Sequence, residues 1–167
     1  MEAAEVVCSG GGIEEEDVLD LMGGLVDKSL VVAEAHAGGS VRYRMLEPIR
    51  QYALEQLGEG GQAEEVRGRH AACFLALAEE AEPELAGQTQ GLWAERLEAE
   101  HDNMRVALSW QLERGEAGSA LRLVAALWRF WHLRGHASEG VGRLERALAH
   151  DELAASPSRV KALEGMG

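Results

Sequence analysis

The residues of this chain whose types could support chemistry begin with a glycine-rich stretch at 23–29, which reads GGLVDKS. A phosphate-binding loop needs the pattern GxxxxGK followed by Ser or Thr, with a glycine directly before the lysine. Here Asp27 stands before Lys28, and its carboxylate would repel a phosphate group. We therefore expect that a helix ends in this stretch and that a strand follows it, with the glycines interrupting the helix. We expect no nucleotide site here.

Two groups of histidines could bind a metal or transfer protons. His132 and His136 have the four-residue spacing that places two ligands on one helix face, but no glutamate directly follows His132. Gly135 is expected to end the helix between them, so a solvated helix end is the simpler interpretation. His101 and Asp102 could form an acid–base pair, but no nucleophile stands beside them, and a helix-surface contact is expected. We predict no catalytic residue, no metal ligand, no cofactor in this chain and no enzyme.

Two tryptophans at helical spacing could form a recognition surface. Tryptophans spaced like Trp128 and Trp131 are typical of a helix core, and we expect Trp128 to pack between neighbouring helices. The alternative is an exposed platform, in which Trp128, Trp131 and His132 are the candidate contacts for a partner.

Composition excludes several classes of protein. The 167 residues carry a formal net charge of −13, whereas nucleic-acid binders usually show a basic footprint that neutralises phosphate. No apolar run approaches the ~20 residues of a membrane-spanning helix, and the first residues lack the basic region of a secretory signal. Cys8 and Cys73 have no CxxC partner, so two reduced thiols and a cytoplasmic protein are expected.

The N-terminal part of the chain is expected to fold into short helices and strands, and these would position any site in it. Val41 to Met45 alternates in polarity, and Gly38 and Gly39 supply the flexible backbone of a hairpin. Pro48 marks a helix start. The expected order is a helix at 2–8, a helix at 14–25 with acidic residues in its first turn, strands at 29–33 and 41–45, and a helix that ends at Gly58.

The remainder reads as successive helices with short turns. We expect a domain boundary near residue 60, with a winged-helix-like domain at 1–60 and a helical repeat region at 61–167. Ser156 and Pro157 look like the start of a further helix. The expected stops are Pro83, the pair Gly115 and Gly118, and Gly135.

Three segments carry a family resemblance. DVLDLMGGLVDKSLVV followed by YRMLEPIRQYALEQL resembles the winged-helix segment of bacterial signal-transduction ATPases with numerous domains, relatives of LuxR-type and antibiotic-regulatory activators. HAACFLALAEEAEPEL, WAERLEAEHDNMRVALSW and ALWRFWHLRGHASEGVGRLERALA resemble the helical region that follows in those proteins, where it leads into tetratricopeptide-like repeats. The resemblance implies a mainly α fold: a truncated winged helix with one β-hairpin, then a tetratricopeptide-like helical array.

What the resemblance implies about function is coupling. In that family the winged helix closes over a nucleotide held by an upstream ATPase domain, and the repeats sense a ligand or partner. The expected partners are the upstream ATPase domain and a protein or peptide that binds the repeats. The chain is expected to be an internal fragment that lacks the first helix of the three-helix winged core. The family's Met-His-Asp motif corresponds to Met45, Leu46 and Glu47 here, and leucine cannot hydrogen-bond a phosphate.

The favoured function is therefore a non-catalytic regulatory and protein-interaction module. The alternative is a DNA-binding winged-helix transcriptional regulator. Charge separates the two, because the helix that would enter the major groove carries carboxylates and no Lys or Arg before Lys28. Only Arg42 and Arg44 on the wing favour DNA.

Overall fold

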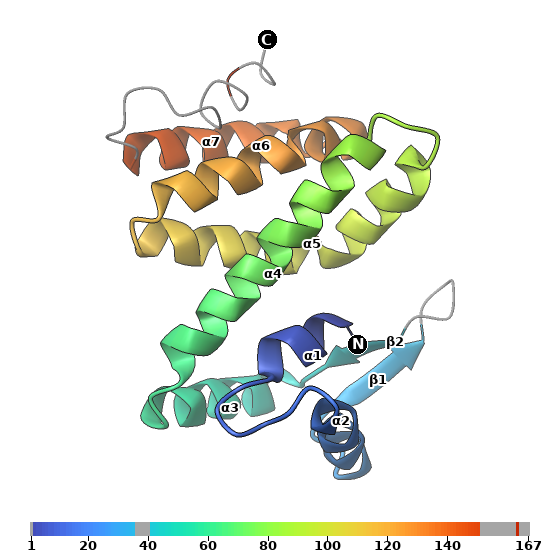
Figure 1. Ribbon diagram of the computed structural model, residues 1–167, viewed down its shortest axis with the longest axis vertical. Helices are drawn as coiled ribbons and strands as arrows, with labels where there is room; N and C mark the ends of the chain where they lie inside the picture. Colours follow the sequence, from blue (N-terminus) through green and yellow to red (C-terminus); the bar gives the residue numbers. More distant parts are fainter. Residues whose placement is uncertain (1, 36–40, 151–162, 164–167) are drawn as a thin grey trace. The chain divides into compact units, whose positions relative to one another are not determined.

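The computed structural model describes residues 2–35, 41–150 and 163. The described part contains seven helices and one two-stranded antiparallel sheet, which confirms the expected mainly α architecture of a winged helix followed by a helical array (Figure 1). None of the helices in this part is long and apolar enough to cross a bilayer. The chain divides into two compact units, Met1–His70 and Ala71–Gly167. The boundary near residue 60 stays a prediction.

The first unit begins with two short helices in contact, α1 (Glu2–Cys8) and α2 (Asp17–Asp27). Val18 is the buried residue of α2. The helix starts three residues later than expected, because Glu14–Glu16 form a turn in which the Asp17 amide donates to the Glu14 carbonyl at 3.0 Å. These three carboxylates therefore precede the helix instead of occupying its first turn.

A hairpin of β1 (Val32–Ala35) and β2 (Val41–Arg44) follows α2, and the predicted pairing is confirmed. The predicted first strand began too early, because Ser29 has a left-handed φ of 57°. The Leu30 amide also donates to the Leu25 carbonyl at 2.9 Å, so this segment closes α2 before the strand begins. The predicted turn at Gly38 and Gly39 lies outside the described residues.

Two helices follow the hairpin, α3 (Glu47–Glu59) and α4 (Ala63–Glu84). Pro48 lies in the first turn of α3, as predicted, where its missing N–H costs no helical hydrogen bond. The Arg69 Nε atom of α4 donates to the Val7 carbonyl at 2.9 Å, which ties the start of α4 to the end of α1. Pro83 lies in the last turn of α4, one residue before the helix ends.

The second unit contains α5 (Gln90–Glu113), α6 (Ala117–Arg134) and α7 (Ala137–His150), and each packs against the next (Figure 1). No strand occurs in the described residues 62–150, as predicted. Gly115 ends a helix with a φ of 72°, but Gly118 lies inside α6 and breaks nothing. The predicted helix start at Ser156 lies outside the described residues. The core includes Phe74, Leu97, Met104, Leu108, Leu121, Leu127, Phe130, Trp131 and Leu144.

Candidate functional site

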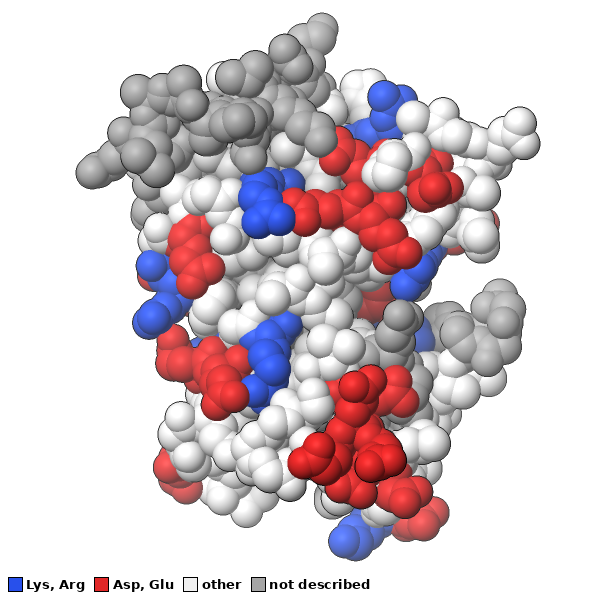
Figure 2. All heavy atoms as spheres, viewed as in Figure 1, with Lys and Arg blue, Asp and Glu red and all other residues white. Residues whose placement is uncertain are grey.

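The first candidate surface is α2 in the first unit. Asp17, Asp20 and Asp27 are exposed on this helix, and its sequence contains no Lys or Arg. Lys28 stands only at its C-terminal end. In the face shown by Figure 2, acidic side chains gather in patches and basic side chains are scattered between them. Because phosphate neutralisation supplies most non-specific DNA affinity, α2 has the wrong charge to lie against a duplex.

The wing is the hairpin of β1 and β2, and it carries two basic side chains, Arg42 and Arg44. The Arg44 guanidinium donates from Nε and Nη2 to Glu34 Oε1, at 3.1 and 2.9 Å. In the strand register Arg42 stands directly opposite Glu34. Both arginines thus lie beside one carboxylate, which offsets part of the positive charge that a phosphate would meet.

The first unit also exposes large apolar side chains. Leu19 and Leu21 on α2 are about half exposed, and Leu46, at the position of the family's histidine, is 52% exposed in extended backbone just before α3. Exposed apolar groups of this size are characteristic of surfaces that contact other proteins. Others in the same unit are Val6, Ile13, Leu30, Val32, Val41, Tyr52 and Leu54.

The second candidate site is a polar cluster inside the second unit, where α5 meets α6 and α7. Trp131 of α6 is 2% exposed, and its indole Nε1–H donates to Nε2 of His101 on α5 at 3.0 Å. His101 is itself 4% exposed. The pKa of His101 is lowered, first by burial and then by the nearby charge of Arg105, so the imidazole is held in its neutral form.

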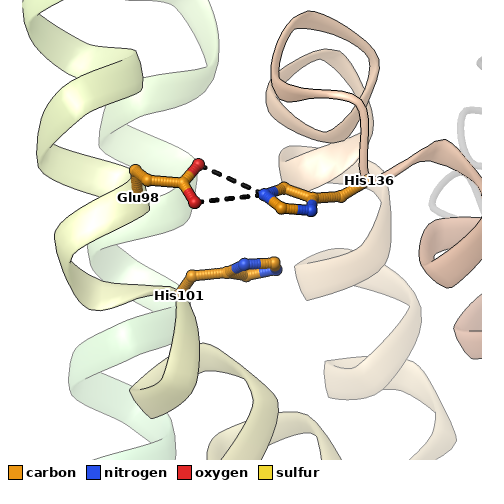
Figure 3. A group of neighbouring side chains, drawn as sticks. All are labelled: Glu98, His101 and His136. Carbon is orange, nitrogen blue, oxygen red and sulfur yellow. Dashed lines mark hydrogen bonds and ion pairs between the residues drawn. The ribbon is translucent and has the colours of Figure 1, made fainter.

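A second imidazole covers the first. Gly135 ends α6 in a left-handed conformation, with φ of 80°, and the His136 amide donates to the Trp131 carbonyl at 2.8 Å. This closure brings the His136 ring over that of His101, with ring centroids 4.5 Å apart (Figure 3). Nε2 of His136 lies 3.2 Å from both carboxylate oxygens of Glu98.

An ion pair closes the other side of the cluster. Arg105 of α5 donates from Nε and Nη2 to the two carboxylate oxygens of Glu139 on α7, at 2.8 and 2.5 Å. This bidentate bond lowers the pKa of Glu139. Arg143 reaches the same region and donates to Ser109 Oγ at 3.0 Å. The cluster therefore cross-links α5 and α7 as well as α5 and α6.

The structure separates the three predicted partner contacts. Trp131 is 2% exposed and offers no surface to a partner, since its indole bonds to His101 of α5 and lies against Gly140 of α7. Trp128 is half-buried instead of fully packed, and His132 is exposed near it, with ring centroids 6.4 Å apart. Trp128 and His132 as partner contacts stay a prediction. His136 lies at the helix end, as expected, but it meets His101 and not His132.

Sequence reasoning missed His101 as a core residue. The expected helix-surface contact of His101 and Asp102 is wrong for His101, while Asp102 is exposed and pairs with Arg105 at 2.8 Å. The signal was available: His101 follows Leu97 by four residues and precedes Met104 by three, which places it on the apolar stripe of α5.

Comparison with known proteins identifies the class of the first unit. Residues 3–58 match the winged helix-turn-helix domain family. With helices α1 and α2 followed by a paired wing, the N-terminal part of this chain is a winged helix-turn-helix domain.

The matches of 139 residues to curated proteins are longer than the first unit and therefore reach into the second. A protein of Mycobacterium tuberculosis, provisionally named an HTH-type transcriptional regulator, is 42% identical over 139 residues, which is 83% of this chain and 15% of the relative. A protein of Mycobacterium bovis with the same kind of name matches equally well. An uncharacterised protein of Mycobacterium tuberculosis is 50% identical over 46 residues, or 28% of this chain and 12% of that protein. The chain spans at most 15% of the length of these relatives. No solved structure matches.

Proposed function

We propose that this chain acts in transcriptional regulation, as one segment of a larger bacterial regulator, and that it has no enzymatic role of its own. The observation that carries the proposal is the winged helix-turn-helix domain at residues 3–58. The provisional names of the relatives that match 139 residues support it. DNA contact by the winged helix is accordingly the first candidate function, in place of the coupling role that the sequence favours.

The wing is the part of the domain that could meet DNA. Arg42 and Arg44 stand on one short strand, and arginine pairs well with phosphate oxygens. α2 lacks such groups, so insertion of α2 into the major groove would place Asp17 and Asp20 against the phosphates. Binding through the wing would therefore be weak, largely independent of base sequence and strongly dependent on salt.

The acidic surface favours a second candidate, which is protein coupling. Residues 1–70 contain six Lys and Arg against fourteen Asp and Glu, a balance that repels a polyanion. The exposed Leu19, Leu21 and Leu46 fit a protein contact better than a DNA backbone. In this candidate the winged helix packs against an ATPase domain elsewhere in the larger protein. The tetratricopeptide-like helices of the second unit then bind a protein or peptide partner.

One titration separates the candidates. The 167-residue chain is added to a fluorescently labelled duplex of mixed sequence, and anisotropy is recorded from 25 to 200 mM KCl. DNA contact through the wing predicts binding at low salt that weakens steeply as salt rises. It also predicts a shallower salt slope for Arg42→Gln with Arg44→Gln. No binding at any salt would reject the first candidate and leave protein coupling as the function of this segment.

A further inference from the structure

The polar cluster of the second unit has a property that neither candidate function uses. His101 lies where α5, α6 and α7 meet, and its Nε2 accepts the indole N–H of Trp131 at 3.0 Å. A neutral imidazole has one nitrogen that accepts and one that carries a proton. Since Nε2 accepts, Nδ1 carries the proton of the neutral ring. The bond between α5 and α6 therefore exists only in one protonation state of His101.

The same fact decides against a metal site. Glu98, His101 and His136 each offer a ligand atom, and these atoms lie within 4.8 Å of one another (Figure 3). A metal ion needs an unprotonated ring nitrogen. In His101 the only such nitrogen already accepts from Trp131, so an ion could bind His101 only by breaking that buried hydrogen bond.

Groups from every neighbouring element face His101. α5 contributes Glu98 and Arg105, and α7 contributes Glu139. Arg143 of α7 does not pair with His101 in these contacts but lies 3.6 Å from Glu139. Glu139 Oε2 lies 4.0 Å from His101 Nε2, but both of its oxygens are already bonded to Arg105. Phe130 meets the ring edge-on at 5.1 Å. A proton added to His101 would therefore find no carboxylate that is not already engaged with a basic group.

His136 makes it more unfavourable for His101 to become a charged imidazolium. A protonated His136 has Glu98 as its counter-ion, 3.2 Å away. Its ring centroid is 4.5 Å from that of His101, so two imidazolium rings here would repel each other. Protonated His101 would also point an N–H at the N–H of Trp131. The geometry of the cluster therefore favours a neutral His101.

We propose that the His101–Trp131 hydrogen bond is an acid-sensitive contact that holds α6 and α7 against α5. Mild acidification breaks this bond and lets the helices separate. Opening would uncover Trp131 and Phe130, two large apolar side chains in the core of the second unit. This proposal does not depend on either candidate function.

The direction of the pH effect follows from the buried state of His101. The pKa of His101 is lowered in the folded chain, whereas the unfolded chain takes up a proton near the ordinary histidine value of about 6.5. Above that pH both states are neutral and the free energy of unfolding is unaffected. As pH falls below about 6.5 the unfolded state binds more protons, so stability declines until pH passes the lowered pKa of folded His101.

The test measures thermal unfolding of the 167-residue chain by circular dichroism between pH 8 and pH 5. The melting temperature should fall by roughly 3–5 °C per pH unit in the steepest part, from the linkage of one proton to folding. His101→Gln, whose Oε1 can still accept from Trp131 but cannot titrate, should flatten this dependence. His132→Gln, an exposed change on α6, should leave it as in the parent chain. An equal fall in His101→Gln would overturn the proposal.

A second measurement holds even if His101→Gln fails to fold. In the unaltered chain, the indole N–H resonance of Trp131 is followed by NMR through the same pH range. We expect its hydrogen exchange, corrected for the intrinsic pH effect, to accelerate at least tenfold at the pH where His101 titrates. A Trp131 indole N–H that stays protected while His101 takes up its proton would overturn the proposal.

Discussion

Gly140 of α7 lies directly against the indole ring of Trp131, and a Cβ atom at this position would stand 2.5 Å from Trp131 Cε3. No real Cβ contact is that short, so the close packing of α7 onto α6 depends on the missing side chain. The contact also keeps Trp131 in place to donate to His101.

Gly140→Ala should therefore destabilise the second unit. Overpacking costs about 1–3 kcal/mol, and alanine returns up to about 1 kcal/mol in helix propensity, which leaves a net loss of roughly 1–2 kcal/mol. Urea unfolding measures the change. Gly142→Ala is the matched control, since a Cβ at Gly142 of the same helix meets nothing within 4 Å. That variant should gain up to about 1 kcal/mol, and equal behaviour of the two variants would contradict the packing argument.

Trp131→Ala should lower the free energy of unfolding by about 3–5 kcal/mol, as truncation of a large buried aromatic side chain does. It also removes the hydrogen-bond donor to His101. Trp128→Ala, three residues earlier on α6, should cost clearly less because that ring is only half-buried. Chemical denaturation of both variants checks the order. The reverse order would restore the sequence-based expectation that Trp128 packs between neighbouring helices.

Glu139→Gln should reduce the loss of stability in acid. The pKa of Glu139 is lowered by Arg105, so the ion pair stabilises the folded chain above the ordinary glutamate pKa of about 4.5. That stabilisation is lost as pH falls from there through the lowered value. Because the pair is partly exposed, we expect an effect of about 1 kcal/mol at neutral pH. Glu145→Gln, an exposed change on α7, is the control, and its pH profile should match that of the parent chain. If the stability of Glu139→Gln depends on pH as that of the parent chain does, the Arg105–Glu139 ion pair does not contribute to the loss of stability in acid.

Glu34→Gln should tighten any binding of the chain to DNA, because it removes the carboxylate that Arg44 and Arg42 face on the wing. Removal of one repulsive charge should raise the affinity at low salt several-fold. Anisotropy titration of a labelled duplex measures it. Glu55→Gln on exposed α3 changes the net charge equally and is the control. Equal affinities for the two variants would mean that net charge, and not the wing, governs the interaction.

The periodicity of apolar residues predicted the helices well, because burial of one face is what makes each helix stable. It could not predict which tryptophan of α6 is buried. Trp128 and Trp131 are three residues apart on one helix, and the residue against which Trp131 packs, Gly140, lies nine residues further on in another helix. His101 was misjudged for a different reason. Its residue type and its charged neighbour Asp102 suggested the surface, while its position on the apolar stripe of α5 placed it inside.

The ends of elements were predicted less well than their centres. Ser29, Leu30 and Val31 have strand-like composition, yet their backbone amides close the end of α2. Local hydrogen bonding of that kind leaves no trace in a pattern of apolar and polar residues. The wing pairing was predicted correctly because the alternation in 41–45 is specific to a half-exposed strand.

The left-handed closure at Gly135 has a consequence for chain length. His136 both completes the hydrogen bonding that ends α6 and supplies the ring that covers His101. An inserted or deleted residue between Arg134 and Ala137 would therefore move that ring away from its neighbour and rotate all of α7 relative to Trp131.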